Sequence, residues 1–153
     1  MSGAGAPKLE IDASGLQVAI VVTSWHTEIT DGLLAGAERA LQAAGNTEYE
    51  IWRVPGAFEL PLGAQYAIDA GADVVIALGV VIQGDTPHFD YVCSAATDGL
   101  NRVQLDSGIP VGFGLLTVNT EQQALDRAGL PGSKEDKGAE AVEAAVLMAR
   151  LRA

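Results

Sequence analysis

With 153 residues, the chain is long enough to bury a substantial core within one domain and too short for two. Twenty acidic side chains against nine basic ones give a formal net charge of −11, which has the wrong sign for binding nucleic acid. The longest apolar run, residues 74–82, is too short to span a bilayer, and no secretory signal pattern opens the sequence. The single cysteine, Cys93, excludes an internal disulfide and a cysteine metal cluster. We therefore expect a cytoplasmic protein that binds no metal, membrane or nucleic acid.

Short β-branched runs alternate with longer stretches of helical period, a pattern typical of a parallel α/β sheet. The predicted strands cover residues 17–23, 48–54, 74–82 and 111–118. Each run is apolar enough for a strand that is covered on both faces. The first strand is expected to be central, with helices on both sides of the sheet.

The segments between these strands carry apolar residues at the helical period, so each is predicted to be a helix with one apolar stripe. The first stripe holds Ile29, Leu33, Ala37, Ala40 and Ala44, and the third holds Phe89, Val92, Cys93, Ala96, Leu100 and Val103. Helix ends are predicted at Gly45, Gly71, Gly108 and Gly129. A last helix over residues 135–152 is apolar on more than one side, so it is expected to pack on the sheet and on a neighbouring subunit.

These elements predict a three-layer α/β/α fold of the flavodoxin-like type with a four-stranded parallel sheet. Residues 16–153 form its single domain, and residues 1–15 are expected to be a flexible N-terminal arm. The hydrophobic fraction of 48% is high for so short a chain, which indicates apolar surface buried between subunits.

In open α/β sheets, ligands bind beyond the carboxyl ends of the strands, and the segment after the third predicted strand is the most informative one. Gly84 permits an unusual backbone angle, Thr86 suits a helix cap and Pro87 suits the first helical position. Free N–H groups would then converge where an anion can bind, although an ordinary capped helix start has the same pattern. His88 in the first turn would be a neutral imidazole able to accept a proton, or simply a surface residue.

Three other residues also have a functional and a structural interpretation. Glu59 lies close before Pro61, which requires an early helix position, so its carboxylate either accepts ligand hydrogen bonds or stabilises the helix dipole. Trp25, at the end of the first strand, either stacks on a planar ligand or packs in the core. Arg127, near the end of a short helix, either binds phosphate oxygens or complements the helix C-terminus.

Several separated stretches follow one another in a characteristic order: residues 54–61 (VPGAFELP), 79–93 (GVVIQGDTPHFDYVC), 110–117 (PVGFGLLT) and 119–129 (NTEQQALDRAG), followed by Lys137 and Gly138. Together, these stretches resemble the lumazine synthases. The resemblance implies an enzyme of flavin biosynthesis that condenses 5-amino-6-(ribitylamino)uracil with 3,4-dihydroxy-2-butanone 4-phosphate. The products would be 6,7-dimethyl-8-ribityllumazine, phosphate and water, and the reaction would need neither a metal nor an organic cofactor.

The resemblance also implies roles for individual residues. Proton transfer falls to His88, and the phosphate-binding residues are Gly84, Asp85, Thr86 and Arg127. The remaining substrate contacts are Trp25, His26, Ala57, Phe58, Glu59, Val80, Val81, Ile82, Phe113 and Lys137. Trp25 would stack on the pyrimidine, and Glu59 would accept hydrogen bonds from ribityl hydroxyls. Phe113 and Arg127 would come from the adjacent subunit of a homopentamer.

Two positions depart from the family pattern. Gln83 stands where arginine is common, and His26 stands where asparagine is common. They leave open a non-catalytic flavin- or lumazine-binding homologue, or a cage-forming one. A second alternative is an archaeal-type riboflavin synthase, which uses no phosphate, and residues 84–86 together with Arg127 argue against it.

The connection over residues 129–138 bears on assembly. It is longer by a couple of residues than in shell-forming relatives and contains Pro131, which stiffens it. We therefore predict pentamers that do not close into shells.

Overall fold

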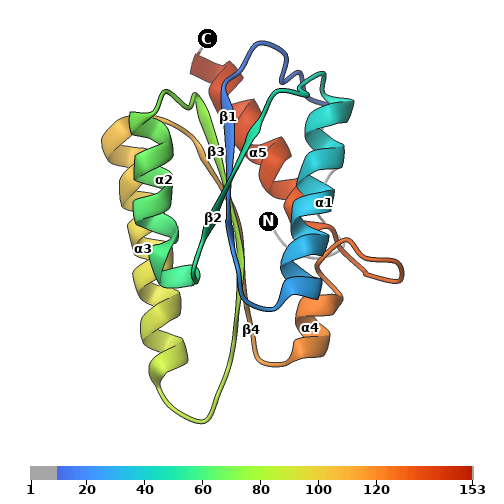
Figure 1. The fold of residues 1–153 in the computed structure, drawn as a ribbon, viewed down its shortest axis with the longest axis vertical. Helices are drawn as coiled ribbons and strands as arrows, with labels where there is room; N and C mark the ends of the chain where they lie inside the picture. Colours follow the sequence, from blue (N-terminus) through green and yellow to red (C-terminus); the bar gives the residue numbers. More distant parts are fainter. Residues whose placement is uncertain (1–9, 153) are drawn as a thin grey trace.

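The β-branched segments form a parallel sheet in the order β2-β1-β3-β4 within residues 10–152, the part of the chain that the computed structural model describes (Figure 1). The strands are β1 (Val18–Thr23), β2 (Glu50–Val54), β3 (Val74–Ile82) and β4 (Val111–Val118). Ile20 of β1 pairs with Ile51 on one side and with Ile76 on the other, which confirms the central position of β1. The predicted bounds of β3 and β4 are confirmed, whereas β1 and β2 begin later than predicted.

Helices cover both faces of this sheet, which gives the predicted three-layer α/β/α architecture (Figure 1). One layer contains α2 (Leu60–Asp69) and α3 (His88–Ser107), with a short 3₁₀ helix, η1 (Ala57–Glu59), before α2. The other contains α1 (Thr27–Ala43), α4 (Glu121–Leu125) and α5 (Lys137–Arg152). The four predicted stop glycines, at positions 45, 71, 108 and 129, all have positive φ. None of the helices within residues 10–152 is long and apolar enough to cross a bilayer.

The sheet has a core on each face because successive strand residues point in opposite directions. Ile20 and Ile76 pack with α1 and α5, and Val21 and Ala77 pack with α2 and α3. Covering of both faces is confirmed for β1 and β3, but the prediction is wrong for β2 and β4. Both of these strands lie at an edge of the sheet, where Ile51 of β2 is 42% exposed and Phe113 of β4 is 50% exposed.

The final helix packs closely on α1. A Cβ atom added to Gly138 would lie 2.0 Å from the carbonyl oxygen of Leu33, so only glycine fits at this contact. Other apolar side chains of α5 point to solvent, namely Leu147, Met148 and Leu151. The expectation that this helix is apolar on more than one side is therefore confirmed.

The predicted N-terminal arm, residues 1–15, lies largely outside the described residues. Residues 10–15 contact the fold: Ala13 is fully buried and its N–H donates to Ala44 O at 2.9 Å. Arg150 donates to the carbonyl oxygens of Asp12 (2.9 Å) and Ser14 (2.6 Å). The hydroxyl and N–H of Ser14 both donate to Asp12, which holds the pKa of that carboxyl below its usual value.

Candidate active site

A cavity of about 780 Å³ opens at the carboxyl edge of the sheet, on the side of α2 and α3. Its walls come from the ends of β1, β2 and β3 and from the first turns of α3. The volume lies within the usual range for small-molecule sites. The predicted site residues that line it are Trp25, His26, Ala57, Phe58, Glu59, Val80, Val81, Ile82, Gly84, Thr86 and His88.

The turn after β1 places an aromatic ring at the rim of this cavity. The Ser24 hydroxyl donates to Val54 O at 2.9 Å, which ties the end of β1 to the end of β2. Trp25 follows and is 69% exposed, so the alternative that it packs in the core is wrong. An exposed indole at a cavity rim offers a flat apolar surface to a planar ligand.

His26 adopts an unusual backbone conformation at the start of α1. Its φ of 55° and ψ of 61° lie in the left-handed region. Its carbonyl oxygen accepts hydrogen bonds from the N–H groups of Ile29 and Thr30, each at 3.0 Å. Asparagine, aspartate and histidine enter this region more readily than other non-glycine residues. Both histidine and the asparagine common in the resembled family therefore fit this turn.

Glu59 lies at the N-terminus of a helix, as predicted. It is the last residue of η1 and directly precedes α2, which carries Pro61 in its first turn. The Glu59 N–H donates to Gly56 O at 3.1 Å, and the side chain is exposed at the cavity. The exposed carboxylate beside the start of α2 is placed to accept hydrogen bonds from ligand hydroxyl groups.

The first residue of α3 is His88, one position later than predicted. Its N–H donates to the Thr86 hydroxyl at 3.4 Å, so Thr86 contacts the helix start although Pro87 holds the capping position. The expected unusual angle at Gly84 is wrong, because its φ is not positive. A Cβ atom on Gly84 would meet no atom within 4 Å, so nothing in the described residues requires glycine there.

The first half of α3 forms a cavity wall that the sequence did not reveal. Of the predicted α3 stripe, only Ala96 and Leu100 are buried. The additional lining residues from this helix are Phe89, Tyr91, Val92 and Ala95. Tyr91 and Ala95 lie three and seven residues after His88, a spacing that places them on its helical face and could have identified them.

Cys93 lies beside these residues and is half-buried. Burial, and to a smaller extent Asp90, raises the pKa of the Cys93 thiol. The thiol therefore stays protonated at neutral pH and is a poor nucleophile.

Four predicted site residues do not line this cavity: Asp85, Phe113, Arg127 and Lys137. Phe113 lies on the edge strand β4 and is 50% exposed. Arg127 and Lys137 flank the connection from α4 to α5, in the opposite helical layer (Figure 1). The Arg127 guanidinium donates to Gln123 O at 2.9 Å. Arg127 therefore complements the C-terminus of α4, which is the structural interpretation given to it above.

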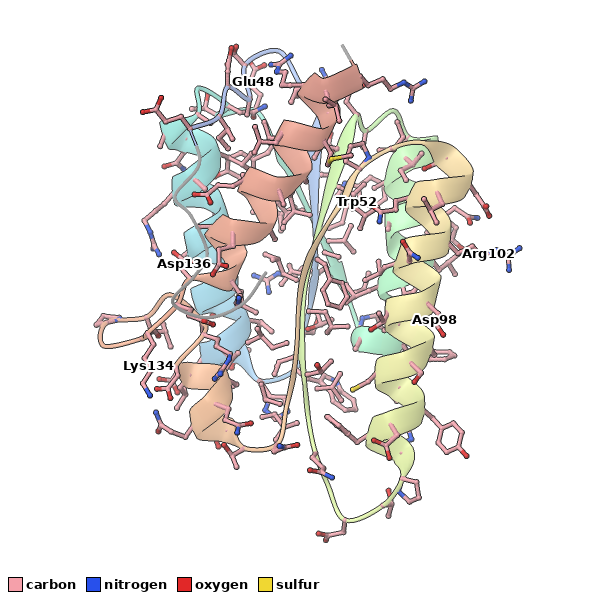
Figure 2. The ribbon with its side chains drawn as sticks, turned by 180° about the vertical axis from the view of Figure 1, so that it is seen from behind. Glu48, Trp52, Asp98, Arg102, Lys134 and Asp136 are labelled. Atoms are coloured by element: carbon pink, nitrogen blue, oxygen red, sulfur yellow. The ribbon has the colours of Figure 1, made fainter. Side chains whose placement is uncertain are left out.

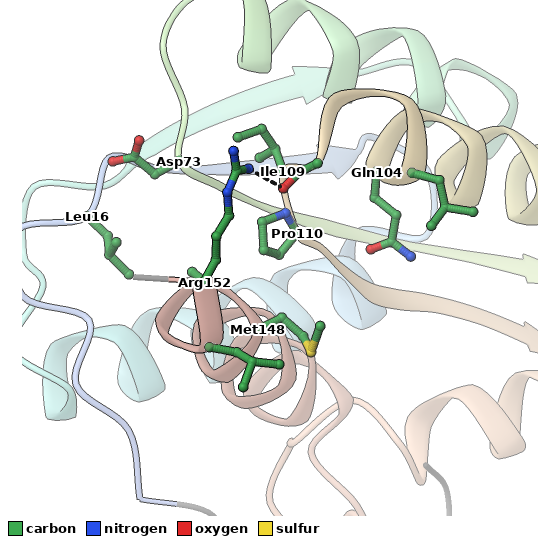
Figure 3. A pocket seen from close by; sticks show the side chains of 11 residues that line it. Leu16, Asp73, Gln104, Ile109, Pro110, Met148 and Arg152 are labelled. Carbon is green, nitrogen blue, oxygen red and sulfur yellow. Dashed lines mark hydrogen bonds between the residues drawn. The ribbon is translucent and has the colours of Figure 1, made fainter.

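A second cavity, of about 1180 Å³, lies at the amino edge of the sheet (Figure 3). Three polar side chains around this cavity form hydrogen bonds with the backbone of the chain. Asp73 accepts from Gln17 N–H at 2.9 Å, Gln104 accepts from Val111 N–H at 3.2 Å and Arg152 donates to Gly108 O at 3.2 Å. No predicted site residue lines this cavity, so the smaller one is the candidate active site.

Nowhere in residues 10–152 do three or more His, Cys, Asp or Glu side chains group as metal ligands.

A family model described as 6,7-dimethyl-8-ribityllumazine synthase matches residues 15–153. The chain belongs to the lumazine synthase family. Relatives named 6,7-dimethyl-8-ribityllumazine synthase include one from Kineococcus radiotolerans, 64% identical over 95% of this chain and 91% of the relative. Another, from Leifsonia xyli subsp. xyli, is 62% identical over 97% and 95%, and one from Clavibacter michiganensis subsp. michiganensis is 62% identical over 99% and 96%.

The lumazine synthase match includes both the cavity and the separate segment that carries Arg127 and Lys137. Such broad similarity supports the lumazine synthase interpretation over the archaeal-type riboflavin synthase alternative.

Proposed function

We propose that the chain catalyses the reaction of its family, as a cytoplasmic transferase of riboflavin biosynthesis. It would condense 5-amino-6-(ribitylamino)uracil with 3,4-dihydroxy-2-butanone 4-phosphate to form 6,7-dimethyl-8-ribityllumazine, phosphate and water. The observation that carries this proposal is the cavity that gathers Trp25, Glu59 and His88 from three separate segments. Relatives with this name at 58–64% identity support it.

The cavity offers complementary contacts for the pyrimidine substrate. The Trp25 ring would stack on the pyrimidine, and the backbone of residues 80–82 would border its polar edge. The Glu59 carboxylate would accept hydrogen bonds from ribityl hydroxyls. Ala57 and Phe58 complete this wall.

His88 would move the protons that the condensation requires. Imine formation, elimination of phosphate and ring closure each need a proton transfer near the leaving group. A histidine at the N-terminus of α3 can serve as acceptor and donor beside the anion site that Gly84, Asp85 and Thr86 would form. Holding both substrates in a reactive orientation can supply roughly 7–11 kcal/mol of the barrier reduction.

The proposed active unit is a homopentamer with shared sites. Phe113 and Arg127 do not line their own chain's cavity, which supports contribution to the cavity of a neighbour. Exposed apolar side chains, including Phe113, Leu147 and Leu151, offer surface for such contacts.

Light scattering on the purified protein tests this assembly. We expect a mass of about five times the 15.8 kDa of one chain. A stable, active monomer would refute the shared site, and a megadalton particle would refute the role of the 129–138 connection in preventing shell formation.

One assay tests the enzymatic proposal. The purified protein is incubated with both substrates while lumazine fluorescence and released phosphate are followed together. We expect both signals to rise in equal molar amounts. Tight binding of a ribityl ligand without turnover would instead support the non-catalytic carrier.

A further inference from the structure

The connection between α4 and α5 places a carboxylate between two cations. Glu135 Oε2 lies 3.7 Å from Arg127 Nε and 3.5 Å from Lys137 Nζ. The Glu135 side chain is only 14% exposed. Its Oε2 is buried and accepts no hydrogen bond from any described residue, so it interacts with the cations through charge. Figure 2 shows the neighbouring Lys134 and Asp136 on the side of α1 and α5, away from α3.

Both cations have a second anchor that does not involve Glu135. Arg127 Nη1 donates to Gln123 O at 2.9 Å, and Lys137 Nζ donates to Glu140 Oε1 at 3.2 Å. Glu135 is therefore not needed to hold either side chain in place. Its distinctive contribution is a negative charge, which, with Glu140, balances the charges of Arg127 and Lys137.

We infer that Glu135 is an intramolecular competitor for the phosphate group of the substrate. Its carboxylate occupies the position between Arg127 and Lys137 that a phosphate oxygen would take. This inference rests on the proposed function, in which Arg127 binds phosphate in the site of an adjacent subunit and Lys137 is a further substrate contact. When no substrate is present, pairing with Glu135 gives the Arg127 guanidinium a carboxylate partner at 3.7 Å. It also weakens the hold on released phosphate, because like charges repel.

Glu135→Gln removes the charge and keeps the shape of the side chain. Isothermal titration calorimetry with inorganic phosphate, on the assembled protein, should show binding about tenfold tighter than in the wild type. The KM for the sugar phosphate should fall, whereas the KM for the pyrimidine should stay unchanged. A merely structural role of Glu135 would not tighten binding of one substrate alone.

Asp126→Asn is the matched control. Asp126 lies at the beginning of the same connection, but its carboxylate contacts Lys134 (3.8 Å) and Gln122 (2.9 Å) instead of Arg127 or Lys137. The phosphate affinity of the Asp126→Asn variant should stay within about twofold of that of the wild type. An increase equal to that of Glu135→Gln would reveal a general charge effect and overturn the inference.

Unchanged, weaker or undetectable phosphate binding by assembled Glu135→Gln would also overturn it. If that variant does not assemble, Glu135→Ala replaces it, and it is also expected to bind phosphate more tightly than the wild type.

The proposed function and the proposed role of Glu135 can be refuted separately. A wild-type protein that forms no lumazine refutes the proposed function, whereas lumazine formation with unaltered phosphate affinity in the variant refutes only the role of Glu135.

Discussion

The two edges of the sheet carry cavities with different chemistry. At the carboxyl edge, α2 and α3 begin, so the positive ends of two helices meet the ends of β1, β2 and β3 beside His88. At the amino edge, α3 and α5 end, and hydrogen bonds of the fold use Asp73, Gln104 and Arg152. The amino-edge cavity is the larger one. The position of strand and helix ends therefore identifies the candidate site better than cavity size does.

The largest effect should come from the proposed proton-transfer residue at the carboxyl edge. His88→Ala should lower kcat by roughly 10²- to 10⁴-fold, the usual range for a positioned acid–base group. The hydrogen bond to Thr86 uses the backbone N–H of residue 88, so it can persist and folding should be retained. Steady-state assays measure kcat on variant protein whose mass and circular dichroism spectrum match those of the wild type. Unchanged turnover would remove His88 from the mechanism.

Arg127→Ala should chiefly weaken binding of the sugar phosphate, by about thirtyfold, because charge-assisted hydrogen bonds to phosphate oxygens are lost. Pyrimidine affinity should remain nearly intact. Calorimetry with each substrate, or with an inert analogue, measures both values. Lys134→Ala, which removes an 81% exposed cation from the same connection, is the control and should change neither. Equal losses for both ligands in Arg127→Ala would indicate a structural role instead.

Trp25→Ala and Met148→Ala compare the rims of the two cavities directly. Loss of the Trp25 ring should weaken pyrimidine binding by about tenfold, a typical effect of removing a stacked aromatic ring. Met148 lies at the amino-edge cavity and is 56% exposed, so its replacement should change this affinity by less than about twofold. Ligand titrations on assembled proteins measure both. A reversed order would move the binding site to the amino edge.

The smallest effect is expected from Arg152→Ala at the amino edge. Only one exposed hydrogen bond to Gly108 O, at 3.2 Å, is removed, so the free energy of unfolding should fall by less than about 1 kcal/mol. The value of kcat should not change. Urea denaturation and steady-state assays test this, and a large loss of activity would give the amino edge a functional role.

Periodicity in the sequence predicted the layers, the central position of β1 and the bounds of β3 and β4. It did not predict the exposure of the edge strands β2 and β4, because edge position depends on strand order rather than on local composition. The third helical stripe shows a second limit. Phe89 and Val92 lie on the same helical stripe as the buried Ala96, yet they line the cavity. An apolar stripe does not distinguish a face that packs in the core from one that lines a binding site.

Single-residue features of the candidate site were also beyond the sequence. Histidine tolerates several backbone conformations, so nothing in the sequence indicated the left-handed φ of His26. The placement of Glu135 between Arg127 and Lys137 depends on the path of an irregular connection, which has no periodicity to interpret. By contrast, the place of Pro61 in the first turn of α2 was predicted from local backbone chemistry, and the start of α3 was predicted to within one residue.

A crystal structure of the assembled protein with an inert analogue of the ribityl pyrimidine and inorganic phosphate tests the central claim most directly. We predict that the pyrimidine lies against Trp25 and that phosphate lies near His88, within reach of Arg127 of the partner subunit. Ligand bound beside Met148 at the amino edge, with the carboxyl-edge cavity empty, would contradict this account.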